Sequence, residues 1–499
     1  METTLNDKLR DITSSLSYFQ PEFVITLGII LTLIAGLFPK IRKSSSLQLL
    51  CLLILAVTLF TDIRQWRTLG ENPQHLFQNM LGLDKVAVFW KFLIGAGAFL
   101  AVAMGYRGRE ATDRQGEYYS LVLSVVLGAH LLAMASNLLL VFISIELISI
   151  SSYLLTAFSF NKNSTEAGMK YLLFGAAASG IMLFGMSWLY AFTGSLHFYQ
   201  PQFAQMMMNV DTIPLAIGCF LVLGGILFKI SAAPMHIWAP DVYTSAPTPV
   251  VAFFSVVPKF AGFALLVKWV IIINLFGLSP LSWSSILAVI AILTITIGNF
   301  SALWQKNVKR MLAYSSIAHS GFLLVTMVAF SELAMQSLLF YSAIYMVMNV
   351  AAFMFVHHVE RSYGYTDVDQ YRGLIKVSVP LAIMIVIIMI SLAGLPPTGG
   401  FTAKLLVFTS LWESYSTKDN PWMLYLMVFG LANTVVSLFY YLRIPYYMIF
   451  KAPEHEADKG KNLFSFENFL GFVMVLALLL IFFKPDGLMR IINSVSFAF

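Results

Sequence analysis

The chain has 499 residues, of which 59% are hydrophobic and only 11% are charged, and its formal net charge is +6. A mean hydropathy of +0.79 excludes an ordinary soluble domain and indicates a polytopic membrane protein in a lipid bilayer. The excess of lysine and arginine lies in loops between apolar runs, so it does not indicate a nucleic-acid partner.

The apolar runs predict an all-α fold. A bilayer core about 30 Å thick needs about 20 apolar residues per helix. By that rule the sequence predicts fourteen spans, at residues 22–39, 45–61, 86–106, 118–135, 137–160, 168–194, 213–243, 248–275, 283–304, 309–330, 334–357, 377–412, 422–450 and 466–484. The first run lacks a small-residue cleavage site, which predicts a retained span rather than a signal peptide. Lysine and arginine concentrate in the odd-numbered loops, so the positive-inside rule predicts both termini on the outer side.

The first three spans read as ordinary apolar helices, and Lys91 within them is interpreted as structural. Cys51 and Cys219 lie in apolar runs and are expected to be small core residues. Two isolated cysteines predict no disulfide framework, no iron–sulfur cluster and no zinc site.

Two predicted spans, 213–243 and 377–412, are too long for one simple crossing. Each contains a proline-rich break, SAAPMHIWAPD in the first and AGLPPTGG in the second. Proline removes a backbone donor and clashes with the preceding turn. Paired interrupted spans indicate a transporter built from inverted repeats. We therefore expect an N-terminal three-helix segment at 1–115, five-helix repeats at 116–280 and 281–450, and a C-terminal loop with the last helix at 451–499.

Four ionisable residues lie in or beside these apolar runs: Glu146, Lys229, Lys259 and Lys404. A charge at bilayer depth costs roughly 2.5 kcal/mol or more, so such residues usually mark an ion path. A carboxylate near a buried lysine favours the charged amine, and separation of the two favours loss of the proton. Glu146 with Lys229 can thus load and release a proton. The alternative is a static buried salt bridge that fixes helix packing.

Lys259 and Lys404 are interpreted as further proton acceptors or donors. For each, the alternative is a lysine whose amine reaches the membrane interface, the role expected of Lys268. His236 and His319 are possible relays because imidazole titrates near neutral pH. Their alternative is a packed, hydrogen-bonded histidine.

Several other polar residues are not expected to be principal proton-transfer sites. His130 has no supporting context. Asp241 is expected to anchor the loop after the seventh span. Hydroxyls on the fifth span, among them those of Ser149 and Tyr153, can hold ordered water or bond the helix backbone.

The sequence resembles the antiporter-like membrane subunits of respiratory complex I. The resemblance covers nearly the whole chain and rests on LLVFISIELISISSYLL, STEAGMKYLLFGAAASGIMLFGMSWLYAFTG, FKISAAPMHIWAPDVYTSAPTPVVAFFSVVPKFAGF, NVKRMLAYSSIAHSGFLL and SLAGLPPTGGFTAKLLVF. It is strongest to the N-type subunit of bacterial proton-pumping NADH:quinone oxidoreductase. Lys404 favours the N type, because M-type subunits usually have a glutamate there. L-type subunits continue into a long lateral helix, which this chain is expected to lack.

The resemblance implies fourteen helices with two inverted five-helix repeats and broken seventh and twelfth helices. It also implies proton transfer along Glu146, Lys229, Lys259 and Lys404. The implied partners are M-type, L-type and small membrane subunits and, through them, a redox arm with NADH, FMN, iron–sulfur clusters and quinone. The chain has no nucleotide, haem or flavin motif, so it is expected to bind no cofactor itself. The implied location is the bacterial inner membrane, with both termini periplasmic.

Three alternatives stay open. The first is a subunit of a multi-subunit cation/proton antiporter, which shares this helix design. The second is the equivalent subunit of a photosynthetic or hydrogenase-linked relative of complex I. The third is a structural scaffold in which the buried charges only pair. Co-purification with flavin and iron–sulfur subunits favours complex I. Lys229→Ala separates proton conduction from scaffolding: in an assembled complex, pumping should fall if Lys229 conducts protons and stay normal if the charges only pair.

Overall fold

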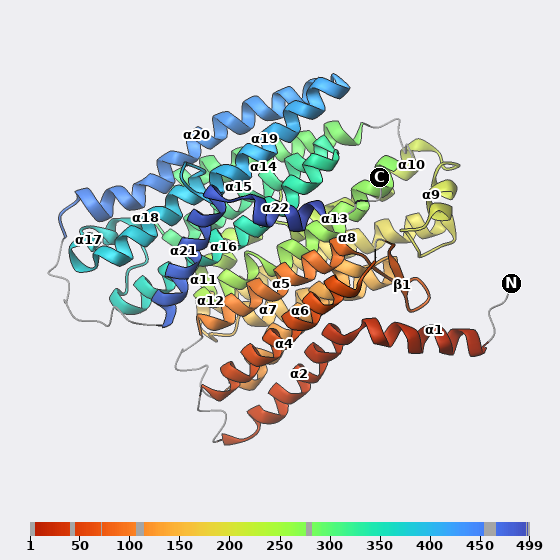
Figure 1. Cartoon of the computed structure of the whole chain (residues 1–499), viewed down its shortest axis with the longest axis horizontal. Helices are drawn as coiled ribbons and strands as arrows, with labels where there is room; N and C mark the ends of the chain where they lie inside the picture. The colour runs from red at the N-terminus through yellow and green to blue at the C-terminus, as the bar shows by residue number, and fades with distance from the viewer. Residues whose placement is uncertain are drawn as a thin grey trace. The chain divides into compact units, whose positions relative to one another are not determined.

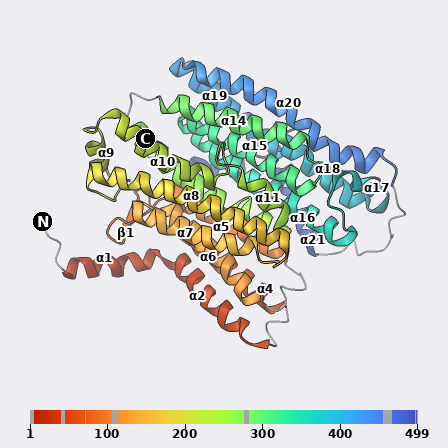
Figure 2. The ribbon, with the colours of Figure 1, turned by 180° about the vertical axis from the view of Figure 1, so that it is seen from behind.

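The computed structural model describes residues 5–39, 45–70, 72–105, 114–275, 282–453, 466–495 and 497. These residues are mostly helical, with one short two-stranded hairpin. They group into two compact units: Met1–Ile230 with Val256–Ser282 and Val495–Phe499, and Ser231–Ser255 with Trp283–Ser494. Figures 1 and 2 show the helices from opposite sides.

The first unit contains the N-terminal helices and the helix that carries Lys259. Its elements are α1 (Leu5–Tyr18), α2 (Gln20–Gly36), α4 (Ser46–Thr68), β1 (Gln74–Leu76), β2 (Leu81–Leu83), α5 (Lys85–Ala103), α6 (Gln115–Met134), α7 (Leu138–Thr156), α8 (Lys162–Thr193), α9 (Pro201–Met207), α10 (Thr212–Lys229) and α13 (Val257–Leu275). Consecutive helices pack on one another from α4 to α8, and α13 packs against α5, α6 and α10.

A capping residue defines the start of α7, and a glycine on α8 allows the two helices to approach closely. The Asn137 side chain accepts a hydrogen bond from the Leu139 amide at 2.9 Å and so caps the start of α7. A Cβ atom at Gly175 on α8 would lie only 1.8 Å from the Tyr153 hydroxyl on α7. Glycine is therefore required where these two helices approach.

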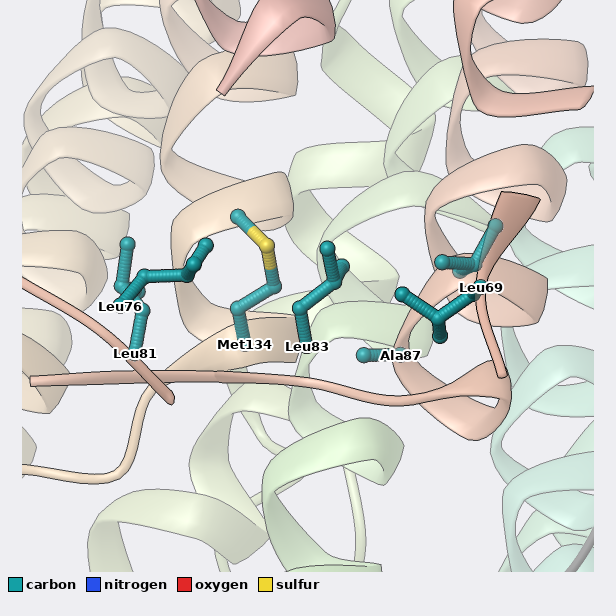
Figure 3. Close-up of a cluster of buried hydrophobic side chains, with 7 residues drawn as sticks. Leu69, Leu76, Leu81, Leu83, Ala87 and Met134 are labelled. Atoms are coloured by element: carbon teal, nitrogen blue, oxygen red, sulfur yellow. The ribbon is translucent and has the colours of Figure 1, made fainter. Parts of the chain in front are cut away.

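The hairpin pairs β1 with β2 antiparallel, with Gln74 opposite Leu83. Its leucines belong to an apolar group, here called the hairpin cluster, made of Leu69, Leu76, Leu81, Leu83, Ala87, Val88 and Met134. Figure 3 shows the Met134 side chain between those of Leu81 and Leu83. The cluster joins the hairpin to the adjacent ends of α4, α5 and α6.

The second unit contains the remaining helices. Its elements are α11 (Trp238–Ser245), α12 (Thr248–Phe254), α14 (Trp283–Leu303), α15 (Val308–Ala329), α16 (Glu332–Tyr363), η2 (Val368–Tyr371), α17 (Leu374–Val377), α18 (Val379–Ala393), α19 (Gly399–Lys418), α20 (Pro421–Phe450), α21 (Phe466–Phe483) and α22 (Asp486–Asn493). α15 packs against α11, α14, α16 and α19, and α16 also contacts α12, α18 and α21.

Within the described residues, eleven helices are long and apolar enough to cross a membrane, or up to thirteen if each bent pair is one span. The bent pairs are α1 with α2, at 77°, and α21 with α22, at 79°. The all-α polytopic fold is thus confirmed. The count of fourteen crossings and the repeat boundaries remain predictions. α18 has only 15 residues, fewer than the roughly 20 that one crossing needs.

Both predicted helix breaks are present. α10 ends at Lys229 and α11 begins at Trp238, while α18 ends at Ala393 and α19 begins at Gly399. The first break contains a cis Ala233–Pro234 bond and the second a cis Pro396–Pro397 bond. Each break leaves the last carbonyl groups of a half-helix without helical donors.

Candidate functional site

Lys229 is the last residue of α10 and lies against α7. Its side chain is almost fully buried, and its Nζ donates a hydrogen bond to Ser149 Oγ at 2.6 Å. Glu146 lies one turn before Ser149, and its Oε1 is buried without a hydrogen bond from the described residues. The ion pair expected between Glu146 and Lys229 is therefore not formed here, because the amine bonds the hydroxyl one turn further along α7.

Lys259 lies in the first turn of α13 and is also buried. α12 ends at Phe254 and α13 begins at Val257, so Pro258 stands at a helix start rather than inside a continuous helix. One turn beyond Lys259, a Cβ atom at Gly262 would lie 2.7 Å from Ile230 Cγ2 and 3.2 Å from Lys229 Cβ. This close approach brings the start of α13 beside the end of α10, so Lys229 and Lys259 lie on adjoining helix segments of one unit.

Lys404 belongs to the second unit, in the second turn of α19. Its Nζ donates to the Ala393 carbonyl at 2.7 Å, at the end of α18, and lies 5.0 Å from the Phe322 ring centroid. The carboxyl end of a helix carries partial negative charge and favours a cation. Gly394 has φ +83°, and a Cβ atom there would lie 2.6 Å from Lys404 Cδ. The amine is thus buried at the break.

His319 on α15 is held by two tyrosine hydroxyls. Its Nδ1 lies 2.7 Å from Tyr341 Oη and its Nε2 lies 3.0 Å from Tyr441 Oη. Tyr441 also bonds the Ser315 hydroxyl. A neutral imidazole donates at one nitrogen and accepts at the other, so this group forms a continuous hydrogen-bonded chain across α16, α15 and α20.

The other predicted residues have less to support them. His236 is half-buried in the first break, and its Nδ1 has no hydrogen-bond partner among the described residues. The Lys268 amine is buried and donates to the carbonyl of Ala135, between α6 and α7, at 3.1 Å, and the interface role expected of it remains a prediction. Asp241 forms a half-exposed ion pair with Arg310 at 3.1 Å, which ties α11 to α15.

Sequence reasoning missed a buried group of charges in the N-terminal helices. Glu22, Asp62, Lys91 and His130 lie together with no exposed surface. The first three spans were interpreted as ordinary apolar helices, and His130 in the fourth was given no supporting context. The available signal was an acid inside each of two apolar runs, Glu22 in QPEFVITLGII and Asp62 in LAVTLFTDI. Such residues are as unexpected in lipid as a buried lysine.

A lysine amine is chemically able to bind and release a proton. The three lysines are buried: Lys229 ends α10, Lys259 lies in the first turn of α13 and Lys404 lies in the second turn of α19. Unwound backbone of the kind found in the two breaks occurs at membrane depth only in protein or beside water. No group of three or more potential metal ligands of the His, Cys, Asp or Glu type occurs among the described residues.

Comparisons with known proteins identify relatives of the whole chain. Residues 135–436 match the family described as NADH:quinone oxidoreductase/Mrp antiporter, TM. The chain is 37% identical to NADH-quinone oxidoreductase subunit N 2 of Chloroherpeton thalassium, over 83% of this chain and 82% of that one. It is 36% identical to NADH-quinone oxidoreductase subunit N of Chlorobium chlorochromatii, over 95% and 94%.

A solved structure gives the same picture. A chain of respiratory complex I from Thermus thermophilus with bound aureothin matches with a TM-score of 0.77 and 27% identity. The match covers 95% of this chain and all of that one. The likeness therefore extends over the N-terminal helices as well as the matched central region.

Proposed function

Because the chain belongs to the NADH:quinone oxidoreductase/Mrp antiporter transmembrane family, we propose that it is the N-type proton-translocating subunit of a bacterial NADH:quinone oxidoreductase. The observation that carries the proposal is Lys229, buried at the end of the broken helix α10 with its amine on Ser149, one turn from Glu146. This arrangement occurs in a chain related along most of its length to proteins named subunit N.

In the first unit, α7 offers Lys229 two alternative partners. Glu146 and Ser149 are three residues apart, so they lie on neighbouring positions of one helix face. A carboxylate beside a buried amine favours the ammonium form, and a hydroxyl alone leaves desolvation to favour release of the proton. Movement of Lys229 between Glu146 and Ser149 thus loads and unloads a proton. Lys259 accepts it, since α13 approaches α10 at Gly262.

In the second unit, the tyrosine hydroxyls and His319 relay protons to Lys404. The imidazole passes a proton by accepting at one nitrogen and donating at the other. Lys404 then holds it at the carbonyl end of α18, where the helix dipole stabilises an ammonium group. His236, in the first break, is a second relay position. The predicted repeats 116–280 and 281–450 each contribute one broken helix to this row.

The redox chemistry takes place in partner subunits. NADH, FMN, iron–sulfur clusters and quinone bind there and supply the free energy for proton movement, while M-type, L-type and small membrane subunits adjoin this chain in the membrane arm. We place the complex in the bacterial inner membrane. Both termini of this chain then lie on the periplasmic side, which the distribution of lysine and arginine supports.

Affinity purification of the tagged chain in mild detergent tests this assignment. We expect flavin and iron–sulfur subunits among the partners identified by mass spectrometry, together with inhibitor-sensitive NADH:quinone reductase activity. Recovery of antiporter-type membrane subunits alone, without redox partners or quinone reduction, would contradict the proposal and assign the chain to a cation/proton exchanger.

A further inference from the structure

A second buried charge group lies on four helices of the first unit that carry none of the residues assigned above. We call Glu22 (α2), Asp62 (α4), Lys91 (α5) and His130 (α6) the four-helix charge cluster. Lys91 Nζ lies 2.7 Å from Glu22 Oε1 and 3.5 Å from Asp62 Oδ1. His130 Nδ1 lies 3.2 Å from the same Glu22 oxygen. All four side chains are fully buried.

The two carboxyl groups differ in the hydrogen-bond donors that face them. Glu22 Oε1 faces both Lys91 and His130, whereas neither Asp62 oxygen accepts a hydrogen bond from the described residues. Lys91 also donates to Gln65 Oε1 at 2.8 Å and to the Met134 sulfur at 3.9 Å, so that with Glu22 its three protons already have acceptors. Asp62 is therefore the cluster member with the least support for a negative charge.

The charge count of the cluster requires one more proton. With both acids ionised, Lys91 charged and His130 neutral, the group would carry one uncompensated negative charge away from water, which is strongly unfavourable. One additional proton makes it neutral.

The geometry selects Asp62 as the holder of that proton. A proton on His130 would place an N–H at Nε2, which has no hydrogen-bond partner among the described residues. It would also leave Asp62 ionised without a hydrogen bond. A proton on Asp62 removes the negative charge from the oxygens that lack donors and leaves the Glu22–Lys91 pair intact.

We propose that the four-helix charge cluster is a proton-binding site, in which Asp62 carries one exchangeable proton at neutral pH. His130 donates its Nδ1 proton to Glu22. At alkaline pH the Asp62 O–H bond breaks, the proton passes to the buffer, and the cluster keeps one negative charge. This site is additional to the row from Glu146 to Lys404, and the inference does not rest on the proposed function.

The elements around the cluster carry few other buried charges. The nearby helices α4, α5 and α6 hold further charged groups near their ends, namely Arg64, Arg67, Lys85, Arg114 and Glu117. α7 carries Glu146, and α13 carries Lys259 and Lys268, of which Lys268 bonds the Ala135 carbonyl. The sulfur of Met134, part of the hairpin cluster in Figure 3, lies 3.9 Å from Lys91 Nζ. Apolar side chains thus border the site.

The cluster also adjoins the helix that carries Lys259. The Trp90 ring lies 5.6 Å from the Phe260 ring, centroid to centroid. Trp90 directly precedes Lys91 in the chain, and Phe260 directly follows Lys259. The helix α5, which carries Lys91, thus packs against the start of α13.

Infrared difference spectroscopy of the purified membrane complex tests the proposal without substrate. Spectra are recorded between neutral and alkaline buffer, with and without ¹³C-labelled aspartate. The variants are Asp62→Asn, His130→Asn and, as a matched control, Glu166→Gln, which removes an exposed carboxylate of an ion pair on α8.

We expect one protonated-carboxyl band at neutral pH that shifts with ¹³C-aspartate and disappears at alkaline pH. It should be lost in Asp62→Asn and retained in His130→Asn and Glu166→Gln. If the band is absent from the wild type, does not respond to ¹³C-aspartate, or survives in Asp62→Asn, the proposal is overturned. A band that is lost in His130→Asn would overturn the assignment to Asp62. If Asp62→Asn fails to assemble, Asp62→Glu replaces it: the band should then persist but no longer respond to ¹³C-aspartate, and a band that still responds would overturn the proposal.

Discussion

The two broken helices place a lysine at the carboxyl end of a half-helix in two different ways. Lys229 is the last residue of α10 itself, and its amine bonds a side-chain hydroxyl on the neighbouring helix α7. Lys404 follows its break, on α19, and its amine turns back to the Ala393 carbonyl at the end of α18. The Glu146 carboxylate lies one helix turn from Ser149, which is the partner of Lys229. The second amine bonds backbone carbonyls among the described residues, those of Leu392 and Ala393.

This difference separates two ways of controlling a proton. The partners of Lys229 are side chains, which can change rotamer, so its environment can alternate between carboxylate and hydroxyl. The partners of Lys404 are backbone carbonyls fixed by the end of a helix, whose partial charge does not change. We infer that Glu146 switches proton loading at Lys229, whereas the position of Lys404 depends on the shape of the break around Gly394.

The largest effect is expected from Glu146→Gln, which keeps the side-chain shape but removes the charge that switches Lys229. Because a positioned proton-transfer group contributes about 10²–10⁴-fold, proton pumping in proteoliposomes should fall at least tenfold. The control is Glu166→Gln, in the exposed pair with Lys170 on α8, which should pump normally. Equal pumping by both variants would show that Glu146 only pairs or packs.

Gly394→Ala should have the next largest effect. It tests whether the position of Lys404 at the second break matters for pumping. Its φ is +83°, and the added Cβ would lie 2.6 Å from Lys404 Cδ, so the lysine must move. Gly364→Ala is the matched control, because Gly364 has φ +72° with no neighbouring atom within 4 Å. Both variants should lose about 1 kcal/mol of stability from the strained backbone.

Pumping distinguishes the two glycine variants. Displacement of Lys404 should raise the activation free energy of proton transfer by about 1 kcal/mol, which corresponds to about fivefold slower pumping. This slowing is expected only in Gly394→Ala. The measurements are thermal unfolding of the complex and the initial pumping rate. The same pumping loss in Gly364→Ala would mean that Lys404 need not occupy the observed position.

Tyr441→Phe tests the relay around His319 and should have a moderate effect. It removes the hydroxyl 3.0 Å from His319 Nε2. The control is Tyr371→Phe, because the Tyr371 hydroxyl is buried without a hydrogen-bond partner among the described residues. Loss of one hydrogen bond of about 0.5–1.5 kcal/mol should slow pumping about threefold in Tyr441→Phe. Indistinguishable rates in the two variants would exclude the relay through Tyr441.

Ser149→Ala should have the smallest effect. It removes the hydroxyl that Lys229 bonds at 2.6 Å but leaves Glu146 in place. We expect about twofold slower pumping, since a net hydrogen bond contributes about 1 kcal/mol or less when water can replace it. Ser152→Ala is the control, because Ser152 bonds the Ile148 carbonyl of its own helix. A loss as large as that of Glu146→Gln would make Ser149, not Glu146, the switching group.

Features that depend on a single segment of the chain could be predicted from the sequence alone. The apolar runs predicted the helices, and the prolines of SAAPMHIWAPD and AGLPPTGG predicted both breaks. The burial of Lys229, Lys259 and Lys404 followed from their places in apolar runs. The half-helix α18, with 15 residues, shows why span counting by length is uncertain at a break. The roles of the candidate residues remain predictions.

Features that depend on distant segments could not be predicted. Asp62 and Lys91 each appear alone in an apolar run, and their proximity depends on how α4 and α5 pack. Lys229 bonds Ser149 and not Glu146. Which of the two it bonds depends on how the turn of α7, about 100° per residue, orients each side chain and on the side-chain rotamers. The hydroxyl partners of His319 come from α16 and α20, more than twenty residues away in sequence.

The most direct test of the central claim compares Lys229→Ala with Lys229→Arg in the complete complex. Assembly is checked by mass spectrometry, and proton pumping and NADH:quinone reductase activity are measured in proteoliposomes. We predict that Lys229→Ala assembles but loses most of its pumping, and that Lys229→Arg does not restore it, because arginine does not release its proton in proteins. Normal pumping by assembled Lys229→Ala would contradict the account and leave the buried charges with a scaffolding role.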